Sequence, residues 1–281
     1  METKPVIGII GGTGKMGQFL ERFFKDRGFS VLISSRKTEL KNIELAKKSD
    51  VVIVSVPLGS VIDVIAEVAL HVKKDGLLCD ISAVKEEPVK AMMKGDSSVV
   101  GIHPVFGPMV ESLKKQTVVL CPARGDEWFV WLKDIFEKAG ARVQITTPEQ
   151  HDRMMAVIQG LVHFSSITSA LTLKKLGVDM EETLAFASPN YRIATGVIGR
   201  ILAQNPEVYA DISLHNKYVK EVVDTFRESS DEVSSAVINK DKAKFEKIFK
   251  ESAEFLGDYK KRAMSETSYI IERIAEEDEK Q

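Results

Sequence analysis

The chain has few cysteines, no long apolar run and no excess of charge of either sign. Two cysteines among 281 residues, Cys79 and Cys121, are too few for a disulfide framework, and both stand in apolar runs, so we expect them reduced and buried. No stretch approaches 18 uninterrupted apolar residues, and the amino terminus lacks the apolar length and cleavage site of a secretory signal. These absences predict a cytoplasmic protein with no membrane partner.

The charge balance also argues against a nucleic-acid partner. There are 39 basic and 41 acidic side chains, giving a net charge of −2, so no overall field would gather nucleic acid or an anionic membrane. A few local arginines could still bind a small anionic molecule. Apolar residues make up 44% and charged residues 28%, which is ordinary for a folded soluble protein, and the length favours two domains.

The apolar pattern changes character near residue 148. From residue 6 to residue 146, short β-branched runs alternate with helix-sized segments, which predicts a mostly parallel sheet with crossover helices. After Pro148 the strand signal disappears and long amphipathic patterns take over. We therefore predict a doubly wound α/β domain over 1–147 and an all-helical domain over 148–281.

A glycine-rich segment opens the first helix. Gly12-Thr13-Gly14-Lys15-Met16-Gly17 directly follows the apolar strand VIGII. In that position the glycines allow a tight turn and a close approach of backbone to a pyrophosphate, while the helix amino terminus offers N–H donors. The alternative is a glycine-rich turn with no ligand. The strand context favours a Rossmann-type domain that binds a nicotinamide dinucleotide.

The second and third strands end in residues that bear on the cofactor. Where a carboxylate usually binds the adenosine ribose, the sequence has Ser34, Ser35, Arg36 and Lys37, whose hydroxyls and positive charges suit a 2′-phosphate. This favours NADP, although a solvated basic turn would leave NAD usable. The third strand ends in Ser55-Val56-Pro57, which we expect to line the cofactor; a simple strand terminus would have the same sequence.

A histidine follows the fifth strand. His103 would lie at the carboxyl edge of the sheet, where an imidazole can take the proton of a substrate hydroxyl while hydride leaves the same carbon. The preceding strand ends in Asp80 and supplies Ser82 and Lys85, either of which could orient the substrate or the histidine. A structural histidine is the alternative. We predict His103, Ser82 and Lys85 as the catalytic group.

The helical half contains candidate substrate ligands. Arg192 and Arg200 are eight residues apart, which brings them to one side of a helix among small residues, where they could bind carboxylates; solvated surface arginines are the alternative. His163 and Gln159, one turn before it, would either line a cleft or belong to a helix core.

No metal site is predicted. The remaining histidines are His71, His151 and His215. None of them has zinc-like spacing with a cysteine or with another histidine. The chemistry is therefore expected to rest on the dinucleotide and on protein side chains.

Several segments together resemble one enzyme family. GGTGKMG, SVPL, DISAVKEEP, GIHPVFGP, IQGLVHF and SPNYRIATGVIGRILAQNPEVYADI closely resemble the prephenate dehydrogenase family over nearly the whole chain. The resemblance implies oxidative decarboxylation of prephenate to 4-hydroxyphenylpyruvate in tyrosine biosynthesis. It implies that His103 holds the ring hydroxyl, that Arg200 binds a substrate carboxylate, and that Arg192 and His163 lie near the pocket. It also implies a homodimer formed by helical domains, with the cleft between the two domains.

The sequence departs from the family pattern at two positions. Ala83 stands where relatives commonly carry serine, which leaves the hydroxyl partner of His103 open unless Ser82 substitutes. Ser35 stands where many relatives have an acidic residue, in agreement with NADP. No chorismate mutase segment precedes the glycine loop and no regulatory domain follows, so we expect the dehydrogenase unit alone.

Three other functions compete with this interpretation. An arogenate dehydrogenase would keep the fold and chemistry and change only the substrate side chain. A β-hydroxyacid dehydrogenase shares the glycine loop but relies on a lysine in the helical half, and GIHPVFGP argues against it. A non-catalytic nicotinamide sensor would bind cofactor without turnover, and the retention of both His103 and Arg200 argues against that.

Overall fold

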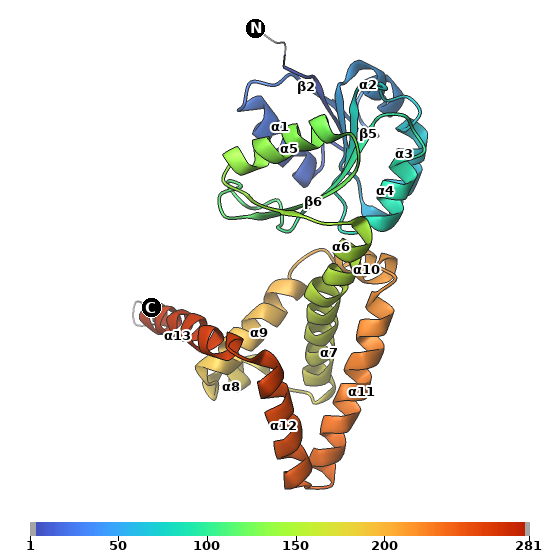
Figure 1. Ribbon diagram of the computed structural model, residues 1–281. Coiled ribbons are helices and arrows are strands. Elements are labelled where there is room, and N and C mark those ends of the chain that lie inside the picture. Colours follow the sequence, from blue (N-terminus) through green and yellow to red (C-terminus); the bar gives the residue numbers. More distant parts are fainter. Residues whose placement is uncertain (1–3, 279–281) are drawn as a thin grey trace. The chain divides into compact units, whose positions relative to one another are not determined.

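The protein, described by a computed structural model over residues 4–278, divides into two compact units. The first comprises Met1–Gln159 and Glu207–Tyr218, and the second comprises Gly160–Pro206 and Val219–Gln281. The first unit contains a seven-stranded sheet, and the elements after it are helical (Figure 1). The predicted fold class, a doubly wound mostly parallel sheet followed by a helical part, is confirmed.

Each apolar run of the first half forms a strand. The strands are β1 Ile7–Ile10, β2 Val31–Ser34, β3 Val51–Val54, β4 Leu77–Asp80, β5 Ser98–Pro104, β6 Thr117–Arg124 and β7 Arg142–Ile145. Their order in the sheet is β2-β1-β3-β4-β5-β6-β7. Strands β1 to β5 pair in parallel, whereas β6 is antiparallel to β5 and β7 is parallel to β6.

Helices cover both faces of the sheet, which explains why its central strands are apolar without interruption. Every residue of β1, β3 and β4 is buried, as expected for parallel strands enclosed on two sides. Helices α1 (Lys15–Lys25) and α5 (Asp126–Lys138) pack on one face. Helices α2 (Asn42–Lys48), α3 (Leu58–Val68) and α4 (Glu86–Met92) pack on the other (Figure 1).

The order of the strands determines where a ligand can bind. β1 lies between β2 and β3, so the chain leaves β1 toward one side of the sheet and later returns to its other side. Such a reversal separates the two adjacent connections and opens a crevice at the carboxyl ends of the strands. The glycine loop follows β1 at this point.

The remaining helices follow β7. They are α6 Pro148–Met155, a π-helical turn Ala156–Leu161, α7 Val162–Lys175, α8 Met180–Ala185, α9 Pro189–Leu202, α10 Pro206–His215, α11 Val219–Ile238, α12 Lys242–Leu256 and α13 Tyr259–Asp278. The Thr147 hydroxyl caps α6 by accepting a hydrogen bond from the Gln150 N–H, and Pro148 occupies its first turn, where a missing N–H costs nothing. The first unit retains α6 and most of α10.

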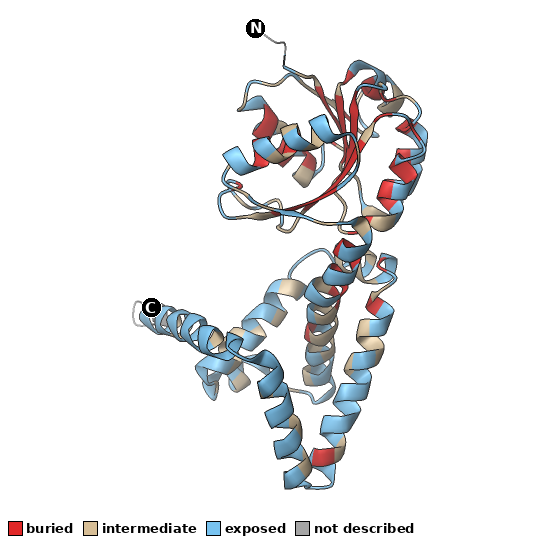
Figure 2. Ribbon diagram, in the orientation of Figure 1, coloured by how far each residue is buried: buried red, intermediate tan, exposed pale blue. Residues whose placement is uncertain are grey.

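The helical unit buries little of its apolar surface. Most of its helical positions are exposed or intermediate, in contrast with the sheet core (Figure 2). The 28-residue segment Pro148–Lys175 is long and apolar enough, by composition, to cross a membrane, and its most apolar window is only 22% buried. The sequence contains no uninterrupted apolar run of this length, but the apolar residues that stand between the polar ones raise the mean hydropathy of the segment. Val162, Ile167 and Leu171 are between 42% and 47% exposed, so this helix presents an apolar surface that needs cover.

Candidate active site

The glycine loop is built by close backbone packing. Gly11 has φ +83°, and a Cβ there would lie 2.1 Å from the carbonyl oxygen of Ser55. A Cβ at Gly17 would lie 2.4 Å from the carbonyl oxygen of Gly11, and one at Gly12 would strike a side chain of β2. At Gly14, by contrast, only one atom comes within 4 Å of such a Cβ, at 3.3 Å. Three glycines therefore let the chain pack tightly, and Gly14 leaves open space at the start of α1.

The start of α1 suits the pyrophosphate of a dinucleotide. Gly14 is its N-cap residue and makes no side-chain cap hydrogen bond, and the first turn contains no acidic residue. Thr13, Gly14 and Lys15 are exposed, while Met16 packs against the core. An uncapped helix terminus presents unsatisfied N–H donors and the positive end of its dipole. The residues present therefore fit the nicotinamide dinucleotide that the sequence predicts.

The third strand contributes a turn next to the glycine loop. The Ser55 N–H donates to the Ile10 carbonyl at 2.8 Å, and Pro57 is the N-cap residue of α3. The structure thus brings Ser55-Val56-Pro57 together with the predicted glycine segment at one edge of the sheet.

The residues after β2 divide into buried and exposed groups. Ser34 is fully buried, and its hydroxyl donates to the Asn42 side-chain oxygen at 2.9 Å, so this hydroxyl serves packing. The Ser35 hydroxyl accepts from the Lys37 N–H at 3.2 Å and shapes the turn. Arg36 and Lys37 are exposed. Of the predicted group, Ser34 is enclosed, Ser35 is half-buried, and the two basic side chains are the most accessible to solvent and hence to a phosphate.

His103 lies near the end of β5 and is 4% exposed. Its Nδ1 lies 2.8 Å from Nε2 of His151, and Nδ1 of His151 lies 2.7 Å from Oδ1 of Asp152. Burial, with additional effects of the neighbouring His151 and of Lys85, lowers the pKa of His103 well below its ordinary value. The neutral form of the His103 imidazole, in which one ring nitrogen keeps its lone pair, is therefore favoured.

His151 and Asp152 were missed at the sequence level. They are adjacent residues of α6, and spacing to other histidines and cysteines was the wrong criterion for them. The Asp152 carboxylate accepts from the N–H groups of Lys85 and Glu86 at 2.7 and 2.9 Å, so it caps the start of α4 from another helix. The available sequence signal was a His-Asp pair that begins four residues after the helix cap Thr147.

Lys85 and Ser82 surround a buried carboxylate. The Lys85 ammonium pairs with Asp80, and both side chains are fully buried. The Ser82 hydroxyl contacts Asp80 and the Val84 carbonyl. Among the residues described, the hydrogen-bond partner of His103 Nδ1 is His151, and Ser82 does not take that place.

The predicted substrate residues lie on three helical elements. Gln159 is half-buried in the π-helical turn, and His163 is in the first turn of α7, where burial lowers its pKa. Arg192 is half-buried and Arg200 is exposed, both on α9. His163, Arg192 and Arg200 belong to the second unit, whereas Gln159 and His103 belong to the first.

The cysteines behave as predicted. Both are free and buried, and burial raises the pKa of Cys121 to about 12 and that of Cys79 further. They are inert thiols. No group of three or more histidine, cysteine, aspartate or glutamate side chains suited to a metal occurs between residues 4 and 278.

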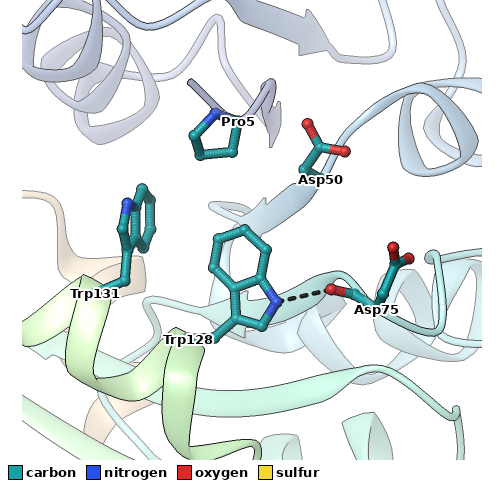
Figure 3. Close-up of a pocket in the computed structure, with 5 residues that line it drawn as sticks. All are labelled: Pro5, Asp50, Asp75, Trp128 and Trp131. Carbon is teal, nitrogen blue, oxygen red and sulfur yellow. Dashed lines mark hydrogen bonds between the residues drawn. The ribbon is translucent and has the colours of Figure 1, made fainter. Parts of the chain in front are cut away.

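A hollow on the first unit lies away from these residues. It is lined by Pro5, Asp50, Asp75, Trp128 and Trp131, and the Trp128 indole donates to the Asp75 carbonyl at 2.8 Å (Figure 3). Pro5, Asp50 and Asp75 precede β1, β3 and β4, so the hollow is at the amino edge of the sheet. The glycine loop and His103 are at the carboxyl edge.

Comparison with known proteins identifies the family. Residues 32–145 match the model "Prephenate dehydrogenase, nucleotide-binding domain", and residues 147–251 match "Prephenate dehydrogenase, dimerization domain". A Methanocaldococcus jannaschii protein described as "Probable arogenate/prephenate dehydrogenase" is 41% identical over 99% of this chain and 67% of its own length. The T-protein of Haemophilus influenzae is 32% identical over 94% of this chain and 71% of its own length.

Solved structures share the fold. Prephenate dehydrogenase from Aquifex aeolicus, in complex with hydroxyphenyl propionate and NAD+, aligns with a TM-score of 0.72 at 20% identity, covering 93% of this chain and 98% of that one. Synechocystis arogenate dehydrogenase aligns with a TM-score of 0.70 at 18% identity, covering 90% and 99%. The chain belongs to the prephenate dehydrogenase family, oxidoreductases of aromatic biosynthesis that use a nicotinamide dinucleotide.

Proposed function

We propose that the chain is a prephenate dehydrogenase that oxidises and decarboxylates prephenate to 4-hydroxyphenylpyruvate with NADP. The observation that carries the proposal is the buried, neutral His103 at the same sheet edge as the glycine loop. Family membership restricts the substrate to prephenate or a close analogue, and the notable competitor is arogenate, which appears in the names of two similar proteins.

In the proposed reaction His103 binds the substrate hydroxyl and takes its proton. When held at the glycine loop, a nicotinamide dinucleotide would supply the acceptor for the hydride that leaves the carbon carrying this hydroxyl. The resulting dienone loses the ring carboxylate as carbon dioxide because the ring then becomes aromatic. The side chains therefore supply proton transfer and positioning, which are the main protein contributions to such chemistry.

The remaining predicted roles are part of the same proposal. Arg200 binds a substrate carboxylate, with Arg192, His163 and Gln159 in supporting positions. A guanidinium suits this role because it can donate two parallel hydrogen bonds to a carboxylate. The exposure of Arg200 leaves its guanidinium accessible to an anion. Ser82 and Lys85, which both contact the buried Asp80 carboxylate, support the site indirectly.

We also propose a cytoplasmic homodimer formed by the helical part after residue 147. The match of residues 147–251 to a dimerization domain supports this assembly. So does the apolar surface that α7 exposes, since a second copy could cover it. Under this proposal the apolar segment Pro148–Lys175 faces protein and no membrane.

The proposal is tested by an assay of reduced nicotinamide with purified protein. Prephenate and arogenate are each supplied with NADP and with NAD, and the product is identified by chromatography. We expect the fastest turnover with prephenate and NADP. A preference for arogenate would correct the substrate, and cofactor binding without turnover in all four mixtures would instead support a sensor.

The NADP preference is expected to depend on Arg36. Replacing Arg36 by glutamate should raise the KM for NADP by about tenfold or more, because a carboxylate repels the 2′-phosphate, while NAD use should persist or improve. Steady-state kinetics with each cofactor measures this change. The control Lys47→Glu makes the same charge change on an exposed residue in the last turn of α2, at the amino edge of the sheet. It should leave the KM values for NADP and NAD unchanged. Equal effects on NADP and NAD at Arg36 would contradict the proposal.

A further inference from the structure

We propose that His151 and Asp152 are positioning residues that hold His103 in the tautomer required of a general base. This inference rests on the proposed function, because it assigns a role within the same reaction. Neither residue was predicted from the sequence, and the contacts between them are short and buried: both side chains of the pair are at most 6% exposed.

The argument starts at Asp152. An ionised carboxylate can only accept hydrogen bonds, and that of Asp152 already accepts from two backbone N–H groups at the start of α4. Its contact with Nδ1 of His151, at 2.7 Å, therefore requires the proton to be on that nitrogen. A neutral His151 then presents an unprotonated Nε2.

The tautomer of His151 in turn determines the tautomer of His103. Nε2 of His151 lies 2.8 Å from Nδ1 of His103, and two unprotonated nitrogens cannot form a hydrogen bond. Nδ1 of His103 must donate, so the lone pair of His103 is on Nε2. That nitrogen is the one left to accept the proton of a substrate hydroxyl.

Among the described residues, two charged groups act on the pair: the Asp152 carboxylate on α6 contacts His151, and the Lys85 ammonium before α4 acts electrostatically on His103. Lys85 is paired with Asp80. The segment after α10 also holds this arrangement, since the side-chain amide of Asn216 donates to the backbone carbonyl of Asp152 at 2.7 Å.

The tautomers can be measured directly. In protein labelled with ¹⁵N at histidine, long-range ¹H–¹⁵N correlations distinguish a proton on Nδ1 from one on Nε2. The signals of His103 and His151 are assigned by their loss in His103→Asn and His151→Gln. We expect both rings to carry the proton on Nδ1 at neutral pH. A proton on Nε2 of His103 in the unaltered protein would overturn the proposal.

Kinetics of variants supply the second readout. His151→Leu should lower kcat by about 100-fold, the size of a general-base contribution, with the KM for prephenate and NADP within about twofold. His151→Gln, whose amide oxygen can accept from His103 Nδ1, should recover part of this loss. His71→Gln, a histidine beyond the carboxyl end of α3, is the matched control.

The outcomes separate this inference from the proposed function. An unaltered kcat in His151→Leu, in a protein with an unchanged melting temperature, would overturn the positioning role even if prephenate is the substrate. If the unaltered protein turns over neither prephenate nor arogenate but shows both expected tautomers, the proposed function fails while the assignment of the rings is supported.

Discussion

Replacing His103 by asparagine is expected to lower kcat/KM for prephenate by about 10³-fold, within the range that a general base contributes. Asparagine keeps a polar side chain of similar size but cannot accept a proton at neutral pH. The cofactor should still bind, because the glycine loop and the turn after β3 do not involve His103. Steady-state kinetics, combined with a titration of NADP binding by fluorescence, measures both properties. His71→Asn serves as the control and should retain full activity.

The pH dependence of the unaltered enzyme should report the same group. The pKa of His103 is lowered from the ordinary value of 6.5, so the decrease of kcat/KM on the acid side should lie at a pH below 6.5. The residual activity of His103→Asn should not show this decrease. An acid limb that persists unchanged in the variant would assign the proton to another residue. Near-normal turnover by His103→Asn would remove His103 from the mechanism altogether.

The lowered pKa also predicts how stability depends on pH. As the pH falls through 6.5, the unfolded chain binds a proton at this histidine before the folded protein does. The contribution of this histidine to the free energy of unfolding is therefore present above pH 6.5 and is lost progressively as the pH falls below that value. His163, whose pKa is also lowered by burial, contributes in the same direction. Urea denaturation on both sides of pH 6.5 should show a smaller difference in His103→Asn than in the unaltered protein.

Replacing Asp80 by asparagine is expected to lower the free energy of unfolding by about 3–5 kcal/mol. The change leaves the Lys85 ammonium without a counter-charge in a site where both side chains are fully buried, and an uncompensated buried charge is strongly destabilising. The ammonium cannot turn to solvent easily, because its stem packs over β5: a Cβ at Gly101 would lie 2.9 Å from the Lys85 Cδ.

A double variant distinguishes charge from packing. Asp80→Asn combined with Lys85→Met removes both charges while keeping an unbranched side chain over Gly101, and should recover much of the lost stability. Glu44→Gln, in the exposed pair with Lys48, should change stability by less than about 1 kcal/mol. Chemical denaturation of the four proteins gives the comparison. A loss below about 1 kcal/mol in Asp80→Asn would mean that the pair is not desolvated as the structure indicates.

Short-range patterns determined the fold and part of the site. Each β-branched run became a strand, since alternation of strand-length and helix-length segments allows few packed arrangements other than a sheet covered on both faces. The glycine segment and His103 could be found for the same reason. Each directly follows or ends a strand, and the carboxyl ends of parallel strands meet at one edge.

Tertiary packing decided what the side chains near that edge contact. His103 and His151 are 48 residues apart, and their contact arises because α6 packs against α4 and β6, the strand that pairs with β5. No local period carries that information. Packing likewise turned the Ser34 hydroxyl toward Asn42 and buried Lys85 against Asp80. The sequence predicted that Ser34, Asp80 and Lys85 lie at the carboxyl edge, but not the direction in which their side chains point. The residue types available at the site are thus a property of the sequence. Which of them meet, and which proton each holds, depends on burial and on contacts between distant elements.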